Sequence, residues 1–234
     1  MIEHRPYAAL GGHDLDWLQA RLHVHIGGMG RPEHGAVGPL RAWNDDTFAP
    51  GSGFGLHRHQ DVEIVTYVRQ GAVTHEDSLG HRSTVQAGDV QAMSAGSGIR
   101  HAERNDGAVP LLLYQIWLRP RTPGGTPSWA TRRFPREERG GGFTVLASGA
   151  AADVAAGALP VNADARLLGA TLRAGETLEH RLAPGRQAYV VTTLGRVRVN
   201  GVELAARDGA RVHDEPVMTI EALDATEVVL AELG

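Results

Sequence analysis

The chain has 234 residues, a formal net charge of −4, 12 histidines and no cysteine. The lack of cysteine excludes disulfides, thiolate zinc sites, iron–sulfur clusters and a cysteine nucleophile, and the near balance of charge argues against broad binding to nucleic acid. The longest nearly apolar run, residues 108–118, is too short to span a bilayer, and no secretory leader pattern opens the sequence, so we expect a cytoplasmic protein.

Residues 14–43 show no sustained helical period, and from residue 51 onward short apolar runs are separated by glycines. The run 62–68 is rich in β-branched and aromatic residues, and a glycine turn signal follows it. Similar runs cover residues 90–93 and 111–118. This pattern is typical of an antiparallel sandwich or barrel, not of alternating strands and helices.

A segment rich in proline, glycine and alanine, residues 121–160, interrupts this pattern in the way that connectors between domains do. Strand-like runs resume after it, with hairpin signals at Asn200-Gly201 and Asp208-Gly209. We therefore predict an N-terminal domain over residues 1–120, a linker over 121–160 and a C-terminal domain over 161–234.

Two pairs of glycines indicate that the second domain repeats the first. Gly51 and Gly71 are 20 residues apart, as are Gly175 and Gly195, and the offset between the pairs is 124. Because both pairs frame strand-like runs, we interpret the chain as a duplicated β-domain.

Ten of the 12 histidines fall at or before residue 101. His57 and His59 are two residues apart, so they point to the same face of a strand and can bind one metal ion. Glu63 keeps the same parity. His101 and Glu103 form a second pair with this spacing. If the two strands are neighbours in a barrel, three imidazoles and one carboxylate converge.

Other histidines are expected to have ordinary structural roles. His23 and His25 also form a pair, but it lacks the spaced glycine before it and the acid four residues after it, and we interpret them as strand or surface residues. His75, Glu76 and His81 lie beside an expected hairpin turn, where solvated polar residues are common, and we do not expect them to be ligands.

The framing residues of the two histidine groups resemble the two cupin motifs: Gly51, His57, His59, Glu63 and Gly71 for the first, and Gly88, Ser94, Gly96, His101 and Asn105 for the second. The second has serine in place of the usual proline and a longer gap before its histidine. These departures, with the strings at 63–68, 88–91 and 93–99, are similar to those of the pirin family.

The resemblance implies an all-β bicupin of two antiparallel, jelly-roll-like β-barrel domains, with one metal in the N-terminal barrel. Its ligands would be His57, His59, His101 and Glu103. The general cupin pattern would instead offer Glu63 as the acid, and spacing alone does not choose between them. We follow the closer resemblance and expect Glu63 beside the metal as a hydrogen-bonding group or proton acceptor.

The repeat register predicts that the second barrel holds no metal. At the offset of 124, the positions matching His57, His59 and Glu63 do not form a ligand set: Arg181, Ala183 and Gln187. His180 alone cannot hold a metal ion.

Nitrogen and oxygen ligands suit a divalent transition metal, with Fe(II) our first choice and Ni, Cu, Mn, Co or Zn as alternatives. The resemblance implies a dioxygenase that opens the ring of a flavonol such as quercetin with O2 and releases CO. Either Glu103 or Glu63 would take the proton of the 3-hydroxyl. The rival hypotheses are a metal-dependent redox sensor that binds a protein partner, and a cupin enzyme acting on another small substrate. We expect a monomer.

Overall fold

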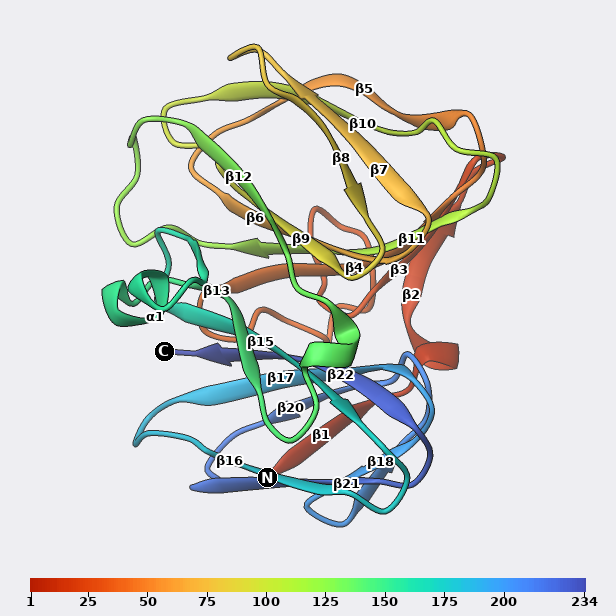
Figure 1. Cartoon of the computed structure of the whole chain (residues 1–234), viewed down its shortest axis with the longest axis vertical. Helices are drawn as coiled ribbons and strands as arrows, with labels where there is room; N and C mark the ends of the chain where they lie inside the picture. Colours follow the sequence, from red (N-terminus) through yellow and green to blue (C-terminus); the bar gives the residue numbers. More distant parts are fainter.

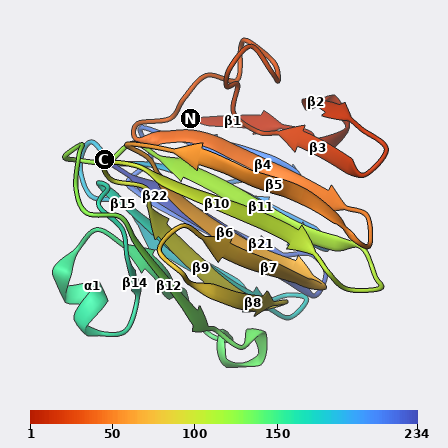
Figure 2. The ribbon, with the colours of Figure 1, turned by 90° about the horizontal axis from the view of Figure 1, so that it is seen from above.

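The chain folds into two β-barrels stacked on one another, which confirms the predicted all-β bicupin architecture (Figure 1). This computed structural model describes residues 1–234 and their side chains, except the side chain of Glu138. Two seven-stranded sheets face each other in the middle of the stack, and a four-stranded sheet closes each barrel on the outside. Viewed from above, the sheets overlie one another and helix α1 (Ala151–Ala155) lies at one edge (Figure 2).

The first barrel has a seven-stranded sheet of order β12-β9-β6-β11-β4-β3-β2 and a four-stranded sheet of order β5-β10-β7-β8. Its strands are β2 (Gly11–Asp14), β3 (Leu18–Leu22), β4 (Leu40–Phe48), β5 (Ser52–His59), β6 (Glu63–Gln70), β7 (Ala72–Asp77), β8 (Arg82–Gln86), β9 (Asp89–Ser94), β10 (Ile99–Asn105), β11 (Leu111–Leu118) and β12 (Ser128–Arg133).

The second barrel has sheets of order β1-β20-β17-β22-β15-β13-β14 and β16-β21-β18-β19. Its strands are β1 (Ile2–Arg5), β13 (Thr144–Ser148), β14 (Leu159–Pro160), β15 (Ala165–Leu172), β16 (Thr177–Arg181), β17 (Gln187–Leu194), β18 (Val197–Val199), β19 (Val202–Leu204), β20 (Gly209–Val212), β21 (Val217–Ala222) and β22 (Thr226–Leu233). Two short 3-10 turns complete the chain, η1 (Tyr7–Ala9) and η2 (Arg136–Glu138).

The two barrels share one topology, which confirms the predicted duplication. The order β9-β6-β11-β4 of the first barrel matches β20-β17-β22-β15 of the second, and β5-β10-β7-β8 matches β16-β21-β18-β19. The offset of 124 residues carries the bounds of β6 onto those of β17.

The structure differs from the predicted domain boundaries at both ends of the first domain. Strand β1 pairs with β20, so the start of the chain belongs to the second barrel. The segment predicted as a linker contains β12, which pairs with β9, and β13, which pairs with β15. These strands cover the edges of the two large sheets, whose backbone groups would otherwise lack partners.

The largest hydrophobic cluster lies between the barrels and joins Trp43, Val65 and Tyr67 of the first to Tyr189 and Val229 of the second. The interior of the second barrel is almost wholly aliphatic. The interior of the first barrel is split into two smaller apolar clusters, and polar side chains are buried with them. Within the described residues, no helix has the length and apolarity that a membrane crossing requires.

Candidate metal centre

Three imidazoles converge inside the first barrel, from the neighbouring strands β5 and β10. In the antiparallel pairing of these strands, His101 lies opposite His57, and Ile99 lies opposite His59. The ring centroids are 4.4 Å apart for His57 and His101, and 5.0 Å apart for His59 and His101. One ring nitrogen of each residue lies within 4.8 Å of the others. The three imidazoles of the predicted set therefore lie together, whereas Glu103 groups with His101 and His75.

A β-bulge on β5 sets the orientation of this cluster. The register shifts between His101 and Glu103, so that Glu103 lies opposite Phe54 and β5 carries one extra residue. The carbonyl oxygen of Gly55, inside the bulge, lies 2.8 Å from Nδ1 of His57. When Nδ1 donates this hydrogen bond, the lone pair on Nε2 of His57 remains available for a metal ion.

The ring nitrogens that face the cluster lack partners. Nε2 of His59 and both ring nitrogens of His101 are buried without a hydrogen bond. Burial, reinforced by the neighbouring imidazoles, lowers the pKa of His59 to about 4 and that of His101 to about 3. At neutral pH these rings are uncharged and offer lone pairs, which is the state that metal ligation requires. The three histidines therefore fit a metal ion.

Glu103 is buried beside the cluster on β10, and two side chains position it. Nε2 of Gln115 donates a hydrogen bond to one carboxylate oxygen at 2.5 Å, and Oγ1 of Thr66 donates to the other at 3.4 Å. The indole of Trp117 in turn donates to Oε1 of Gln115 at 3.0 Å. Burial raises the pKa of Glu103, although the bonds from Gln115 and Thr66 oppose that rise. Glu103 is the predicted acid that the structure places next to His101.

His75 is a member of the site that the sequence analysis missed. Its ring, that of His101 and the carboxylate of Glu103 bring one ligand atom each to within 4.8 Å. The expectation that His75 is solvated is wrong, because it is fully buried. The alternation of buried Val73, His75 and Asp77 along β7 was a signal that His75 points inward.

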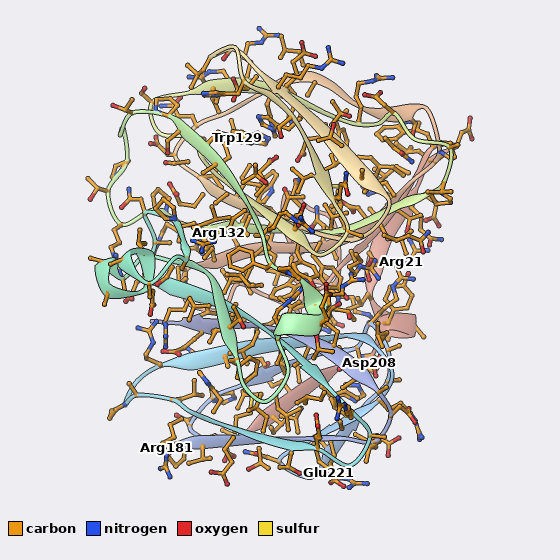
Figure 3. All side chains as sticks on the ribbon, in the orientation of Figure 1. Arg21, Trp129, Arg132, Arg181, Asp208 and Glu221 are labelled. Carbon is orange, nitrogen blue, oxygen red and sulfur yellow. The ribbon has the colours of Figure 1, made fainter. Side chains whose placement is uncertain are left out.

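Both ring nitrogens of His75 already have partners. Nε2 lies 3.2 Å from a carboxylate oxygen of Asp77, and Nδ1 lies 3.2 Å from the amide nitrogen of Gln91. Trp129, labelled on β12 in Figure 3, stacks on the ring at a centroid distance of 5.0 Å. His75 is therefore held in place, whereas His101 has two unpartnered nitrogens.

The expectation that Glu63 lies beside the metal is wrong. Its carboxylate accepts hydrogen bonds from Oγ of Ser94 at 2.7 Å and from the backbone nitrogen of Asn162, in the second barrel, at 2.9 Å. The chain turns between β5 and β6 at Asp61, whose φ of 51° is left-handed, and β6 belongs to the other sheet. Parity counted from His59 does not survive this turn, so Glu63 faces the interface between the barrels.

His23 also lies at that interface and is not the strand or surface residue that was expected. It is fully buried, with Nδ1 3.0 Å from the hydroxyl of Tyr189. Burial lowers the pKa of His23 to about 3. The ring fills a polar position between the two domains.

A cavity of about 290 Å³ opens onto His57 and His59. Its apolar walls are contributed by five side chains: Leu18, Ala20, Met29, Phe54 and Trp117. Polar side chains of β2, β4 and β11 line the rest: His13, Asn44, Asp46 and Gln115. The cavity therefore gives a small molecule access to the histidine cluster.

The second barrel has no comparable cluster among its described residues. Arg181, the position predicted to match His57, is exposed at the outer surface (Figure 3). Leu182 packs into the aliphatic interior instead, and His180 lies 3.0 Å from a carboxylate oxygen of Glu232. The repeat register is thus one residue off in β16.

Each of the two barrels matches a known protein family. Residues 8–118 match the family described as Pirin, and residues 145–233 match the one described as quercetinase C-terminal cupin domain. A pirin-like protein of Caulobacter vibrioides is 50% identical over 232 residues, which is 99% of each chain. A protein of Escherichia coli named quercetin 2,3-dioxygenase is 39% identical over 234 residues, covering 100% of this chain and 99% of its own.

Solved structures show the same arrangement. The bacterial pirin YhhW of Escherichia coli, in complex with nickel(II), superimposes with a TM-score of 0.92 at 36% identity. The match covers 100% of this chain and 99% of the other.

Proposed function

The chain belongs to the pirin family, and on this basis we propose that it is a metal-dependent dioxygenase that opens the ring of a flavonol such as quercetin with O2 and releases CO. The observation that supports this most directly is the cluster of three imidazoles, open to a cavity of about 290 Å³, in which Nε2 of His59 and both ring nitrogens of His101 are buried without a partner. A relative that is 39% identical over the full chain is named quercetin 2,3-dioxygenase.

In this proposal His57, His59, His101 and Glu103 hold one divalent metal. His75 is not a ligand, because Asp77 and Gln91 occupy both of its ring nitrogens. Mixed nitrogen and oxygen donors suit Fe(II), our first choice, and also Ni, Mn, Co, Cu or Zn. When bound, such a metal supplies Lewis acidity and a route for electrons between the substrate and O2.

The protein's own groups bind and orient the substrate. The apolar walls of the cavity, with Phe54 and Trp117, suit a flat aromatic ring. Glu103 would take the proton of the flavonol 3-hydroxyl, since burial raises its pKa and makes it a stronger base. Gln115 would hold the carboxylate in position during that transfer. Glu63 has no role in this step, because it faces the other barrel.

The test is to prepare the metal-free protein under anaerobic conditions and load it with each metal in turn. Oxygen uptake and CO release are then measured with and without quercetin. We expect quercetin-dependent uptake with CO formed in equal amount, and its loss together with bound metal in His101→Ala. The matched control is His180→Ala, which removes a histidine of the second barrel and should retain both.

Full turnover by His101→Ala would overturn the assignment of the site. If the protein binds metal tightly but consumes no oxygen with any flavonol, the dioxygenase proposal is overturned and a metal-dependent binding protein is favoured instead. The metal content of each sample is measured together with its oxygen uptake.

A further inference from the structure

The polar side of the cavity carries hydrogen-bonding atoms that no protein group satisfies. Asn44 and Asp46 are two residues apart on β4 and both line the cavity. Oδ1 of Asn44, Oδ1 of Asp46 and Nδ1 of His13 are buried without a hydrogen-bond partner. Since buried polar atoms in folded proteins nearly always have a partner, these three point to a ligand or to ordered water.

Asp46 is the most unusual member of the set, because it is only 3% exposed. Its neighbour Asp45 points to the opposite face of β4 and is paired with the guanidinium of Arg207 at 2.7 Å. The guanidinium of Arg69, the cation whose charge acts on Asp46, pairs with Asp45 instead. Burial, reinforced by the negative charges of Asp45 and Glu103, raises the pKa of Asp46 well above its usual range. A protonated carboxyl offers a hydroxyl donor and a carbonyl acceptor at once.

The dimensions of the cavity bring a ligand to these atoms. A volume of about 290 Å³ is at the lower end of pockets that bind drug-sized molecules, roughly 300–1,000 Å³. A flat aromatic ligand that occupies this cavity therefore contacts β4 as well as His57 and His59. The apolar walls offer it no polar contact, so hydroxyl groups that face β4 meet Asn44 and Asp46.

We propose that Asn44 and Asp46 are specificity residues that hydrogen-bond the ring hydroxyl groups of the substrate that face β4, so that the cavity selects polyhydroxylated flavonols over flavonols with the 3-hydroxyl alone. This inference rests on the proposed function. It adds which part of the substrate is recognised and by which strand.

The test measures equilibrium binding without turnover. Metal-loaded protein is titrated anaerobically with quercetin and with 3-hydroxyflavone, and the absorbance shift of the flavonol reports the Kd. We expect the wild-type protein to prefer quercetin. Asp46→Ala and Asn44→Ala should weaken quercetin binding about tenfold or more, as expected for lost buried hydrogen bonds, and should change 3-hydroxyflavone binding less than about threefold.

Two further variants separate recognition from packing. Asp46→Asn keeps a donor and an acceptor and should retain the preference for quercetin. Thr47→Val lies on the same strand and, by alternation, on the other face of the sheet, and should bind both flavonols as wild type does. The thermal unfolding midpoint of the ligand-free Asp46→Ala protein should not fall, because its carboxyl oxygen Oδ1 holds no part of the fold in place.

Equal losses for the two flavonols, or an unchanged preference in Asp46→Ala and Asn44→Ala, would overturn the inference and leave the proposed function standing. A lower unfolding midpoint in ligand-free Asp46→Ala would assign Asp46 a structural role and also overturn it. A wild-type protein that is loaded with metal and binds neither flavonol would overturn the proposed function itself.

Discussion

Gln115 is the residue whose loss should most clearly separate the positioning of Glu103 from metal ligation itself. Its amide donates to Glu103 at 2.5 Å and accepts from the indole of Trp117 at 3.0 Å, so it connects the acid to the cavity wall. Gln115→Met keeps nearly the same shape and removes both hydrogen bonds. Because the side chain is only 6% exposed, water cannot easily replace the amide.

The size of the effect follows from the charge on the acceptor. A hydrogen bond to a charged group contributes about 1.5–3 kcal/mol, and outer groups that orient a metal ligand are worth about 10–100-fold in metal affinity. The bond from Gln115 also lowers the pKa of Glu103 against the effect of burial. Without it that pKa rises, so metal binding must displace a proton more often and the loss of affinity should grow as the pH falls.

The assay is a competition for metal against a chelator of known affinity, at several pH values, with metal content measured directly. Thr66→Val is the matched control, because it removes the other hydrogen bond to Glu103. That bond is 3.4 Å long and therefore weak, so its loss should lower the metal affinity less than about threefold. Trp117→Phe removes the indole bond and leaves the Gln115 amide on Glu103. The reasoning would be refuted if Gln115→Met bound metal as tightly as the wild-type protein, or if Trp117→Phe lost as much metal affinity as Gln115→Met.

Three further predictions concern the interface and the metal. Glu63→Gln should change the metal affinity less than about twofold and lower the free energy of unfolding by about 1 kcal/mol, because Glu63 accepts a hydrogen bond from the backbone of Asn162. Loss of metal binding in this variant would instead make Glu63 part of the metal site. His23 is neutral when buried, with its pKa lowered to about 3, and the unfolded chain takes up that proton below about pH 6.5. Stability is therefore lost as the pH falls from 6.5 towards 3, by about 2 kcal/mol at pH 5, and His23→Phe should flatten the urea-unfolding profile there; an unchanged slope would contradict this. Removing the metal with a chelator should lower the thermal midpoint of the wild-type protein and of His180→Ala, but not that of His101→Ala, and an equal shift in His101→Ala would mean that the metal binds elsewhere.

The histidine cluster could be predicted from the sequence because it depends only on strand alternation. His57 and His59 share a face by their spacing of two, as His101 and Glu103 do, and the glycine frame fixes which strands carry them. The pairing of His101 with His57 then follows from the barrel topology. Their role as metal ligands stays a proposal.

The prediction from strand alternation failed for residues beyond the end of the strand. The count from His59 to Glu63 crosses a turn with a left-handed Asp61, and β6 enters the sheet that faces the other barrel. The count from β5 to β16 fails for a related reason, because the bulge gives β5 one residue that β16 lacks. The position of His75 near a turn predicts solvent exposure, whereas the alternation of β7 turns its side chain inward. Bulges and left-handed residues such as Asp61 change parity, and the alternation of a strand does not by itself show where they lie.

The unequal interiors of the two barrels follow from what each must do. In the second barrel Ala188, Val190 and Leu230 pack into a mainly aliphatic core, which favours stability because it buries apolar area. In the first barrel, unpartnered atoms such as those of His101 and Asp46 remain buried, and each of them costs free energy until a metal or a ligand meets it. The cluster between the seven-stranded sheets packs the two barrels against one another, so its buried apolar area contributes to the stability of both. This difference favours a supporting role for the second barrel, whose interior is mainly aliphatic, beside a first barrel that buries the histidine cluster.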